Sequence, residues 1–217
     1  MNASTPILEN GDRLSRYEFE QCYQKMPHLK KAELIEGKVY MASPLRFEPH
    51  AEPHANLIGW LWNYKIATSG VRLGDNATIK LDLDNELQPD AVLLLDSNHG
   101  GQTSIDEEGY IVGAPEMVIE IAASTASIDL HEKKQVYCRN GVKEYLVWRV
   151  IDQQLDWFYL QQENYTSLTP DEKGIIESRV FPGLWLNQAA LITGEMQEVM
   201  RTLQAGLTSP AHQQFLQ

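Results

Sequence analysis

Two acidic residues stand beside or within apolar runs, and their placement is the first sign of chemistry in this sequence. Glu120 lies inside Met117-Val-Ile-Glu-Ile-Ala-Ala123, and Asp90 directly precedes Ala91-Val-Leu-Leu-Leu95. A buried, ionised carboxylate is costly without a partner, so Glu120 needs a cation, either a core lysine or arginine or a bound metal ion. For Asp90 the simpler interpretation is turn chemistry, because Pro-Asp commonly precedes a strand.

Basic residues follow Glu120 on a segment with helical spacing. Leu130, Lys133, Lys134 and Tyr137 recur at three- and four-residue intervals and share one face. Taken alone, the two lysines are typical of a solvated surface pair. Together with two carboxylates from neighbouring strands, they indicate metal-dependent hydrolysis of phosphodiesters. The acids would bind a hard divalent cation, while a lysine orients the attacking water or stabilises developing charge.

Several other chemistries lack their motifs. The sequence contains no GxxxxGK[ST] phosphate loop, no GxSxG elbow and no GxGxxG turn after a strand. His131-Glu132 begins like the zinc-protease motif HExxH, but Gln135 occupies the position of the second histidine. These absences argue against nucleotide kinases, serine hydrolases, dinucleotide enzymes and zinc proteases.

His50 and His54 have the four-residue spacing of a metal pair on a helix. Pro49 and Pro53 adjoin them, and proline inside a helix removes a hydrogen bond and clashes with the preceding turn. We therefore expect loop histidines rather than a metal pair.

The elements that position these residues can be traced along the chain. A capping box at Ser15-Arg-Tyr-Glu18 predicts a helix that ends before Pro27. Further helices are predicted at 54–68, 129–140 and 186–204, a loop at 43–53, and strands within 31–40, 71–73, 78–83, 88–95, 117–123, 144–150, 151–161 and 165–169. Strand, helix and strand over residues 117–150 imply a right-handed crossover and a partly parallel sheet. We expect a single α/β domain over 1–217, with a core of about 15–186 and a helical tail of about 187–217.

Composition narrows the class of protein. The 217 residues are 43% hydrophobic and 22% charged, which is typical of a globular chain. Cys22 and Cys138 are too few for a disulfide framework, and no apolar segment resembles a signal peptide or a membrane helix. We expect a cytoplasmic protein with no membrane partner.

The charge balance bears on the substrate. Lysine and arginine number 18 against 30 acidic residues, a net charge of −12, which disfavours non-specific adhesion to nucleic acid. A nuclease this acidic needs a locally basic groove, shared across a homodimer if one chain does not supply it. Candidates for the groove are Lys30, Lys31, Lys80, Lys133, Lys134 and Arg139.

The sequence resembles the Uma-two (Uma2) family in a set of motifs that keep a consistent order and spacing. These motifs are Glu33-Leu-Ile-Glu-Gly37, Ser43-Pro44, Gln88-Pro-Asp90, Val118-Ile-Glu-Ile121, Asp129-x-x-x-Lys133-x-x-x-Tyr137, Gly141-Val-x-Glu-Tyr145 and Phe181-Pro-Gly-Leu-Trp185. The resemblance implies a restriction-endonuclease-like fold, with a central mixed β-sheet flanked by helices. It also implies the nuclease pattern PD…(D/E)xK.

That resemblance assigns roles to the acids. Asp90 matches the aspartate of the PD element and Glu120 the acid that follows, so both are implied ligands of Mg²⁺, or of Mn²⁺ in its place. Glu33 is the implied third acidic residue of the site, and Glu36 is the alternative.

The lysine departs from the general nuclease pattern. Ala122 stands two residues after Glu120, where the pattern has lysine. The resemblance implies that Lys133, four residues before Tyr137, takes that role, and Lys134 is the alternative.

Three functions remain open from the sequence. The first is a Mg²⁺-dependent endonuclease that hydrolyses DNA, with Glu33, Asp90, Glu120 and Lys133 as its catalytic residues. The second is a non-catalytic or regulatory module that retains the nuclease fold, which the missing ExK lysine and the acidic charge favour. The third is a metal-dependent phosphoesterase acting on a smaller substrate.

Overall fold

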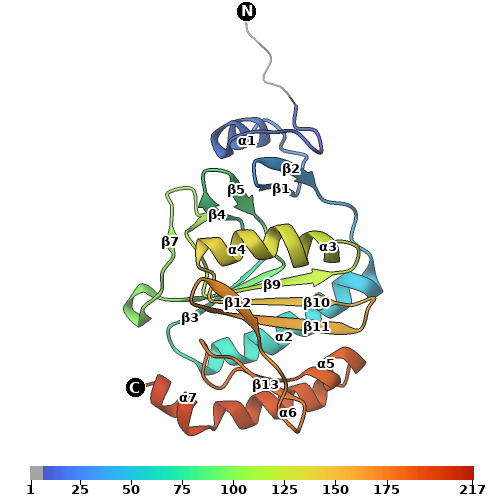
Figure 1. The fold of residues 1–217 in the computed structure, drawn as a ribbon. Helices are drawn as coiled ribbons and strands as arrows, with labels where there is room; N and C mark the ends of the chain where they lie inside the picture. The colour runs from blue at the N-terminus through green and yellow to red at the C-terminus, as the bar shows by residue number, and fades with distance from the viewer. Residues whose placement is uncertain (1–6) are drawn as a thin grey trace, which may run out of the picture.

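Six strands form the central sheet of the structure, a computed structural model that describes residues 7–217 (Figure 1). In spatial order they are β12 (Asn164–Ser167), β11 (Gln154–Gln161), β10 (Glu144–Arg149), β9 (Met117–Ala122), β6 (Ala91–Leu95) and β3 (Val71–Asp75). β9 and β10 pair in parallel, and the other neighbours in this sheet are antiparallel. The predicted mixed sheet is therefore confirmed.

A second sheet lies in the upper part of Figure 1. Its strands, in order, are β2 (Lys38–Met41), β1 (Ala32–Ile35), β5 (Asn85–Leu87), β4 (Ile79–Asp82), β8 (Ile111–Val112) and β7 (Ser104–Ile105). The strand pair predicted around Gly37 is the β1–β2 hairpin. Its two loop residues, Glu36 and Gly37, have φ of 52° and 68°, as a type I′ turn requires. A small third sheet pairs β13 (Ile175–Glu177) with β14 (Trp185–Asn187).

Helices lie on both faces of the central sheet, α4 on one face and α2 on the other (Figure 1). The helical segments of the chain are α1 (Arg16–Tyr23), η1 (Phe47–Ala51), α2 (Glu52–Ala67), η2 (Ser97–His99), α3 (Ala126–Ile128), η3 (Asp129–Lys133), α4 (Lys134–Asn140), α5 (Gln188–Thr193), α6 (Met196–Leu207) and α7 (Pro210–Phe215). η1 and η3 are single π-helical turns that continue into α2 and α4, whereas η2 is a 3₁₀ turn. The capping box of Ser15 and Glu18 is confirmed at α1. Within residues 7–217, no helix has the length and apolar character needed to cross a membrane.

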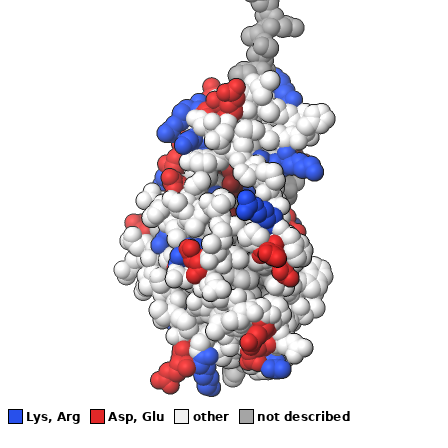
Figure 2. Space-filling view, turned by 90° about the vertical axis from the view of Figure 1, so that its right-hand side faces the viewer, with Lys and Arg blue, Asp and Glu red and all other residues white. Residues whose placement is uncertain are grey.

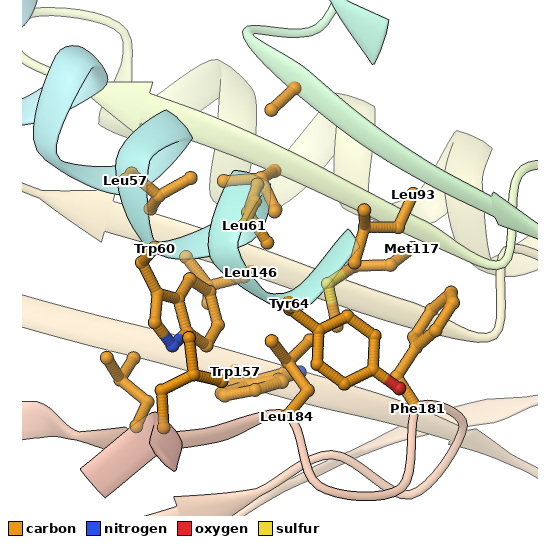
Figure 3. Close-up of a cluster of buried hydrophobic side chains, with 14 of the residues drawn as sticks. Leu57, Trp60, Leu61, Tyr64, Leu93, Met117, Leu146, Trp157, Phe181 and Leu184 are labelled. Atoms are coloured by element: carbon orange, nitrogen blue, oxygen red, sulfur yellow. The ribbon is translucent and has the colours of Figure 1, made fainter. Parts of the chain in front are cut away.

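The larger hydrophobic core lies between the central sheet and helices α2, α5 and α6. Figure 3 shows its largest side chains, which interlock across the sheet face. They include Leu57, Trp60, Leu61, Tyr64, Leu93, Met117, Leu146, Trp157, Phe181 and Leu184. The C-terminal helix α6 adds Val199, Leu203 and Leu207 to the same core, and it packs against α2 and β14.

Alternation along β9 decides which residues face this core and which face α4. Met117, Ile119 and Ile121 belong to the core beneath α2, whereas Val118 and Ala122 pack on the opposite face with α4. Side chains alternate with period two along a strand. Glu120 must therefore point toward α4 and away from the larger core.

The predicted loop at 43–53 is wrong from Phe47 onward, where η1 begins. Pro53 falls in the first turn of α2, where a missing N–H is tolerated, and the preceding π turn bonds Glu52 N to Phe47 O instead. Pro49 thus lies in the first turn and Pro53 follows the π turn, so neither breaks the helix, and His50 and His54 are helical residues.

The single closing helix predicted at 186–204 is also wrong. Three helices occupy residues 188–215, and the first ends at Gly194 with φ of 77°. A left-handed glycine at this position is a common helix terminator.

Candidate active site

Three predicted residues from distant parts of the chain meet on the α4 face of the central sheet. Glu33 comes from β1, Glu120 from β9 and Lys133 from η3. Lys133 Nζ lies 2.9 Å from Glu120 Oε1 and 3.1 Å from Glu33 Oε1, and all three side chains are buried. The backbone N–H of Gln88 donates to the same Glu33 oxygen at 2.8 Å. Glu33 is therefore fixed between the lysine and the segment that carries Asp90.

Asp90 lies next to Glu120 because of the strand register. Ala91 pairs with Ile119 in the antiparallel β6–β9 ladder, so the next step of the ladder sets Asp90 opposite Glu120. The backbone N–H of Ile121 donates to Asp90 Oδ2 at 2.7 Å, which fixes one carboxylate oxygen. All four residues predicted for the site, Glu33, Asp90, Glu120 and Lys133, thus occupy one buried region.

The other oxygen of Asp90 faces a histidine and a lysine. His50 Nε2 is 3.4 Å and Lys31 Nζ 3.9 Å from Asp90 Oδ1. Burial alone would raise the pKa of Asp90, but His50, Lys31 and the Ile121 N–H together hold that pKa below its ordinary value. These contacts therefore favour the ionised form of Asp90.

Acids outnumber cations around Lys133. Asp129 Oδ1 is 3.6 Å from Lys133 Nζ, so Glu33, Glu120 and Asp129 share one ammonium. Burial, with the neighbouring acids, raises the pKa of Glu120 to about 8 even though Lys133 opposes the rise. Burial would lower the pKa of Lys133, yet these carboxylates raise it well above its ordinary value. Lys133 is thus a charged donor at neutral pH and cannot serve as a base.

The structure distinguishes Glu33 and Lys133 from the alternatives Glu36 and Lys134. Glu36 is exposed at the β1–β2 turn and pairs with Arg139 at 2.7 Å, outside the site. Lys134 lies 3.6 Å from the centre of the Phe158 ring and does not contact the acids of the site. Glu33 and Lys133 are therefore the members that the fold brings together.

Two contacts of the site were missed from the sequence. His50 was expected in a loop, yet it is buried on η1 and contacts Asp90. Asp129 had been noted only in the spacing Asp129-x-x-x-Lys133-x-x-x-Tyr137, which sets three side chains on one helical face. That spacing was the available signal, since Asp129 pairs with Lys133 and the Tyr137 hydroxyl donates to Glu120 Oε1 at 3.1 Å. Both η1 and η3 are π-helical turns, which occur frequently at functional sites.

Comparison with known proteins identifies the family. The model of the Uma2 family, described as putative restriction endonuclease, matches residues 16–189. The chain belongs to the Uma2 family. The matched range contains Glu33, Asp90, Glu120 and Lys133, and it ends within α5. None of the curated proteins searched matches this Uma2 chain.

A solved structure shares the fold of this Uma2 chain. It is a putative nuclease belonging to DUF820 from Anabaena variabilis ATCC 29413, with a TM-score of 0.59 and 16% sequence identity. The similarity covers 79% of this chain and 97% of the other. At this identity the comparison establishes the fold alone, and it confirms the predicted nuclease-like α/β architecture.

The donors of the Uma2 site fit a cation held by few protein ligands. Within residues 7–217, no three or more His, Cys, Asp or Glu side chains are grouped so that they could hold a metal ion. Mg²⁺, however, commonly uses one or two carboxylates and keeps several waters. Asp90, directly before β6, and Glu120, on the adjacent strand β9, offer that donor set, and buried Asp129 Oδ1 has no hydrogen-bond partner among the described residues. The hard oxygen donors and the surplus negative charge therefore suit a metal ion bound by two carboxylates and by waters. They do not suit a site in which the protein supplies every ligand.

The predicted basic groove does not form from most of its candidates. Lys80 is buried with Asp106 and Glu108 at 3.0 and 3.3 Å, and Arg139 pairs with Glu36. A surface hollow of about 810 Å³ beside α4 is lined partly by Lys134 and Arg139, but by none of the site acids. Figure 2 faces the side on which η1 lies and shows Lys and Arg side chains on either side of recessed acidic atoms.

Proposed function

We propose that this Uma2 protein is a Mg²⁺-dependent endonuclease that hydrolyses phosphodiester bonds of DNA, with Mn²⁺ able to replace Mg²⁺. The observation that carries the proposal is the placement of Asp90 opposite Glu120, with Lys133 Nζ 2.9 Å from Glu120. Membership in a family of putative restriction endonucleases and the nuclease-like fold support the same function.

Asp90 and Glu120 would hold the metal ion, which polarises a phosphoryl oxygen and makes water more acidic when bound. Lys133 has three N–H donors, and its hydrogen bonds go to Glu33 and Glu120. The third N–H makes no hydrogen bond within the described residues and has Asp129 Oδ1 at 3.6 Å, so it would turn to a water or to a phosphate oxygen as negative charge develops. Glu33 and Tyr137 act as positioning residues, because they hold Lys133 and Glu120 in one arrangement.

A cleavage assay tests this function. Supercoiled, linear and single-stranded DNA are incubated with Mg²⁺ or Mn²⁺ and with the wild type, Asp90→Ala or Glu120→Ala. Each variant is expected to lose at least about 100-fold in rate, the scale of losing one electrostatic group of an active site. Glu36→Ala, which removes an exposed acid outside the site, serves as the matched control and should cut normally. The proposal is wrong if the wild type cuts none of these DNAs, or if the two site variants cut as fast as the control.

A second function is a non-catalytic module that retains the fold. It is favoured by Lys133, whose ammonium already neutralises part of the charge of Glu33 and Glu120. Calorimetric titration with Mg²⁺ and Mn²⁺ distinguishes the two functions. Absence of binding at millimolar concentrations, together with absence of cleavage, supports the module.

A further inference from the structure

The segment that leads from β2 into η1 exposes apolar side chains beside a cation. Leu45 and Phe47 are 65% and 69% exposed, and Arg46 between them is also exposed. Single exposed apolar residues are ordinary, but an exposed aromatic next to arginine is a feature of surfaces on which nucleic-acid bases stack. In Figure 1 the segment follows the right-hand edge of the molecule.

Both ends of this segment are tied to neighbours of Asp90. At one end, Ala42 N donates to the backbone oxygen of Lys31, whose Nζ is 3.9 Å from Asp90 Oδ1. At the other end, His50 Nε2 is 3.4 Å from the same oxygen. An extended chain covers at most about 3.6 Å per residue, so the Cα of Arg46 lies within roughly 14 Å of those of Ala42 and His50. Leu45, Arg46 and Phe47 therefore lie on a short segment that links two neighbours of Asp90.

The cations on and near this segment are available to a ligand. The side chains of Lys30 and Arg46 are exposed, and neither makes an ion pair or hydrogen bond with another residue of the described range 7–217. Lys31 is partly buried and faces Asp90. Glu48 is the acid within the segment, so these four side chains carry a surplus of positive charge. This part of the surface is locally basic on a chain whose net charge is −12.

Resting on the proposed function, we propose that Lys30, Leu45, Arg46 and Phe47 form the binding surface for an unpaired nucleic-acid strand that enters the site. Phe47 stacks on a base, and Lys30 and Arg46 contact phosphates next to the one that is cut. A duplex keeps its bases stacked on one another, so it offers no free base face to an exposed ring. A duplex-binding protein also commonly uses more phosphate contacts than these few cations supply. The preferred substrate is therefore single-stranded DNA or an unpaired region of DNA.

Binding is measured by fluorescence anisotropy with a short labelled oligonucleotide, single-stranded or annealed to its complement. EDTA is present so that binding is recorded without cleavage. The wild type should prefer the single strand, Phe47→Ala should weaken that binding by about 10-fold, and Phe47→Tyr should restore it. Arg46→Ala should reduce the slope of log affinity against log salt by about 0.7. Ile151→Ala, a control at a residue 67% exposed in the turn after β10, should bind like the wild type.

The surface is assigned wrongly if the wild type binds neither DNA, if Phe47→Ala binds like Ile151→Ala, or if duplex is bound as tightly as single strand. Thermal unfolding of each variant excludes misfolding, and Phe47→Tyr keeps the test independent of folding. Failure of the surface is distinguishable from failure of the proposed function. If the wild type cleaves DNA but Phe47→Ala binds it as well as the wild type does, this surface alone is rejected. If binding depends on Phe47 but the wild type does not cleave DNA, only the endonuclease function is rejected.

Discussion

Replacing Lys133 with methionine should destabilise the protein strongly, because the ammonium is the shared partner of three buried acids. Its Nζ lies 3.0 Å from Glu33, 2.9 Å from Glu120 and 3.6 Å from Asp129. Methionine has a similar length and no charge, so Lys133→Met retains the packing and removes the pairing. Breaking a buried ion pair from one side typically costs about 3–5 kcal/mol, because the opposite charge stays buried and uncompensated.

The magnitude can be checked by a double mutant. Glu120→Gln removes one of the acids that Lys133→Met leaves unpaired, so the double variant should recover about 1–3 kcal/mol relative to additivity. Lys134→Met is the matched control, because it removes the neighbouring lysine, which contacts the Phe158 ring instead of the acids. Its expected cost is about 1 kcal/mol or less, the scale of a cation–π contact.

Urea unfolding followed by tryptophan fluorescence measures these free energies. Trp60 and Trp157 are buried in the larger core and report its exposure. The reasoning is refuted if Lys133→Met costs no more than Lys134→Met. It is also refuted if Glu120→Gln adds its full separate cost to Lys133→Met, because the two side chains would then be energetically independent.

Two further predictions concern groups around the site and in the second sheet. His50→Ala removes a partner of Asp90. It should weaken Mn²⁺ affinity about 10-fold in a calorimetric titration, because losing a residue that orients a metal ligand typically has an effect of this size. An unchanged affinity would show that His50 does not position Asp90. Burial and the adjacent Glu20 raise the pKa of Glu86 to about 8, so the folded chain holds a proton that the unfolded chain releases above about pH 4.5. Stability should therefore fall between about pH 4.5 and 8, by at most about 1.4 kcal/mol per pH unit from this group, and Glu86→Gln should remove that contribution in urea unfolding at several pH values. Parallel stability curves for Glu86→Gln and the wild type would contradict it.

Local patterns were sufficient to predict the strands that carry the acids. An acid inside an apolar run is improbable without a partner, and Glu120 is therefore recognisable as a site residue from the sequence alone. The alternation of side chains along β9 then explains why Glu120 faces α4, whereas Ile119 and Ile121 face the larger core. Helical spacing likewise predicted that Lys133 and Tyr137 share a face, and both contact Glu120.

Contacts between distant segments could not be predicted from local patterns. Lys133 meets Glu33 across 100 positions of the chain, and only the packing of the second sheet against η3 brings them together. The choice between Glu33 and Glu36 depended on the β1–β2 turn, which leaves Glu36 exposed.

His50 was misplaced for a different reason. Proline was treated as a helix breaker, although the same residue is tolerated in the first turn, and nothing in the local pattern showed that the helix begins at Phe47. Whether a proline disrupts a helix depends on where the helix begins, because proline is tolerated in the first turn and not in the interior.

The most direct test of the central claim is a crystal structure of the protein soaked in Mn²⁺, with the metal located by anomalous scattering. The proposed function predicts a peak bound by carboxylate oxygens of Asp90 and Glu120, with the Lys133 amine within about 4–6 Å of it, where charge coupling is strong. No peak at these carboxylates under millimolar Mn²⁺, with Lys133 still paired to Glu120, would contradict the metal-dependent mechanism.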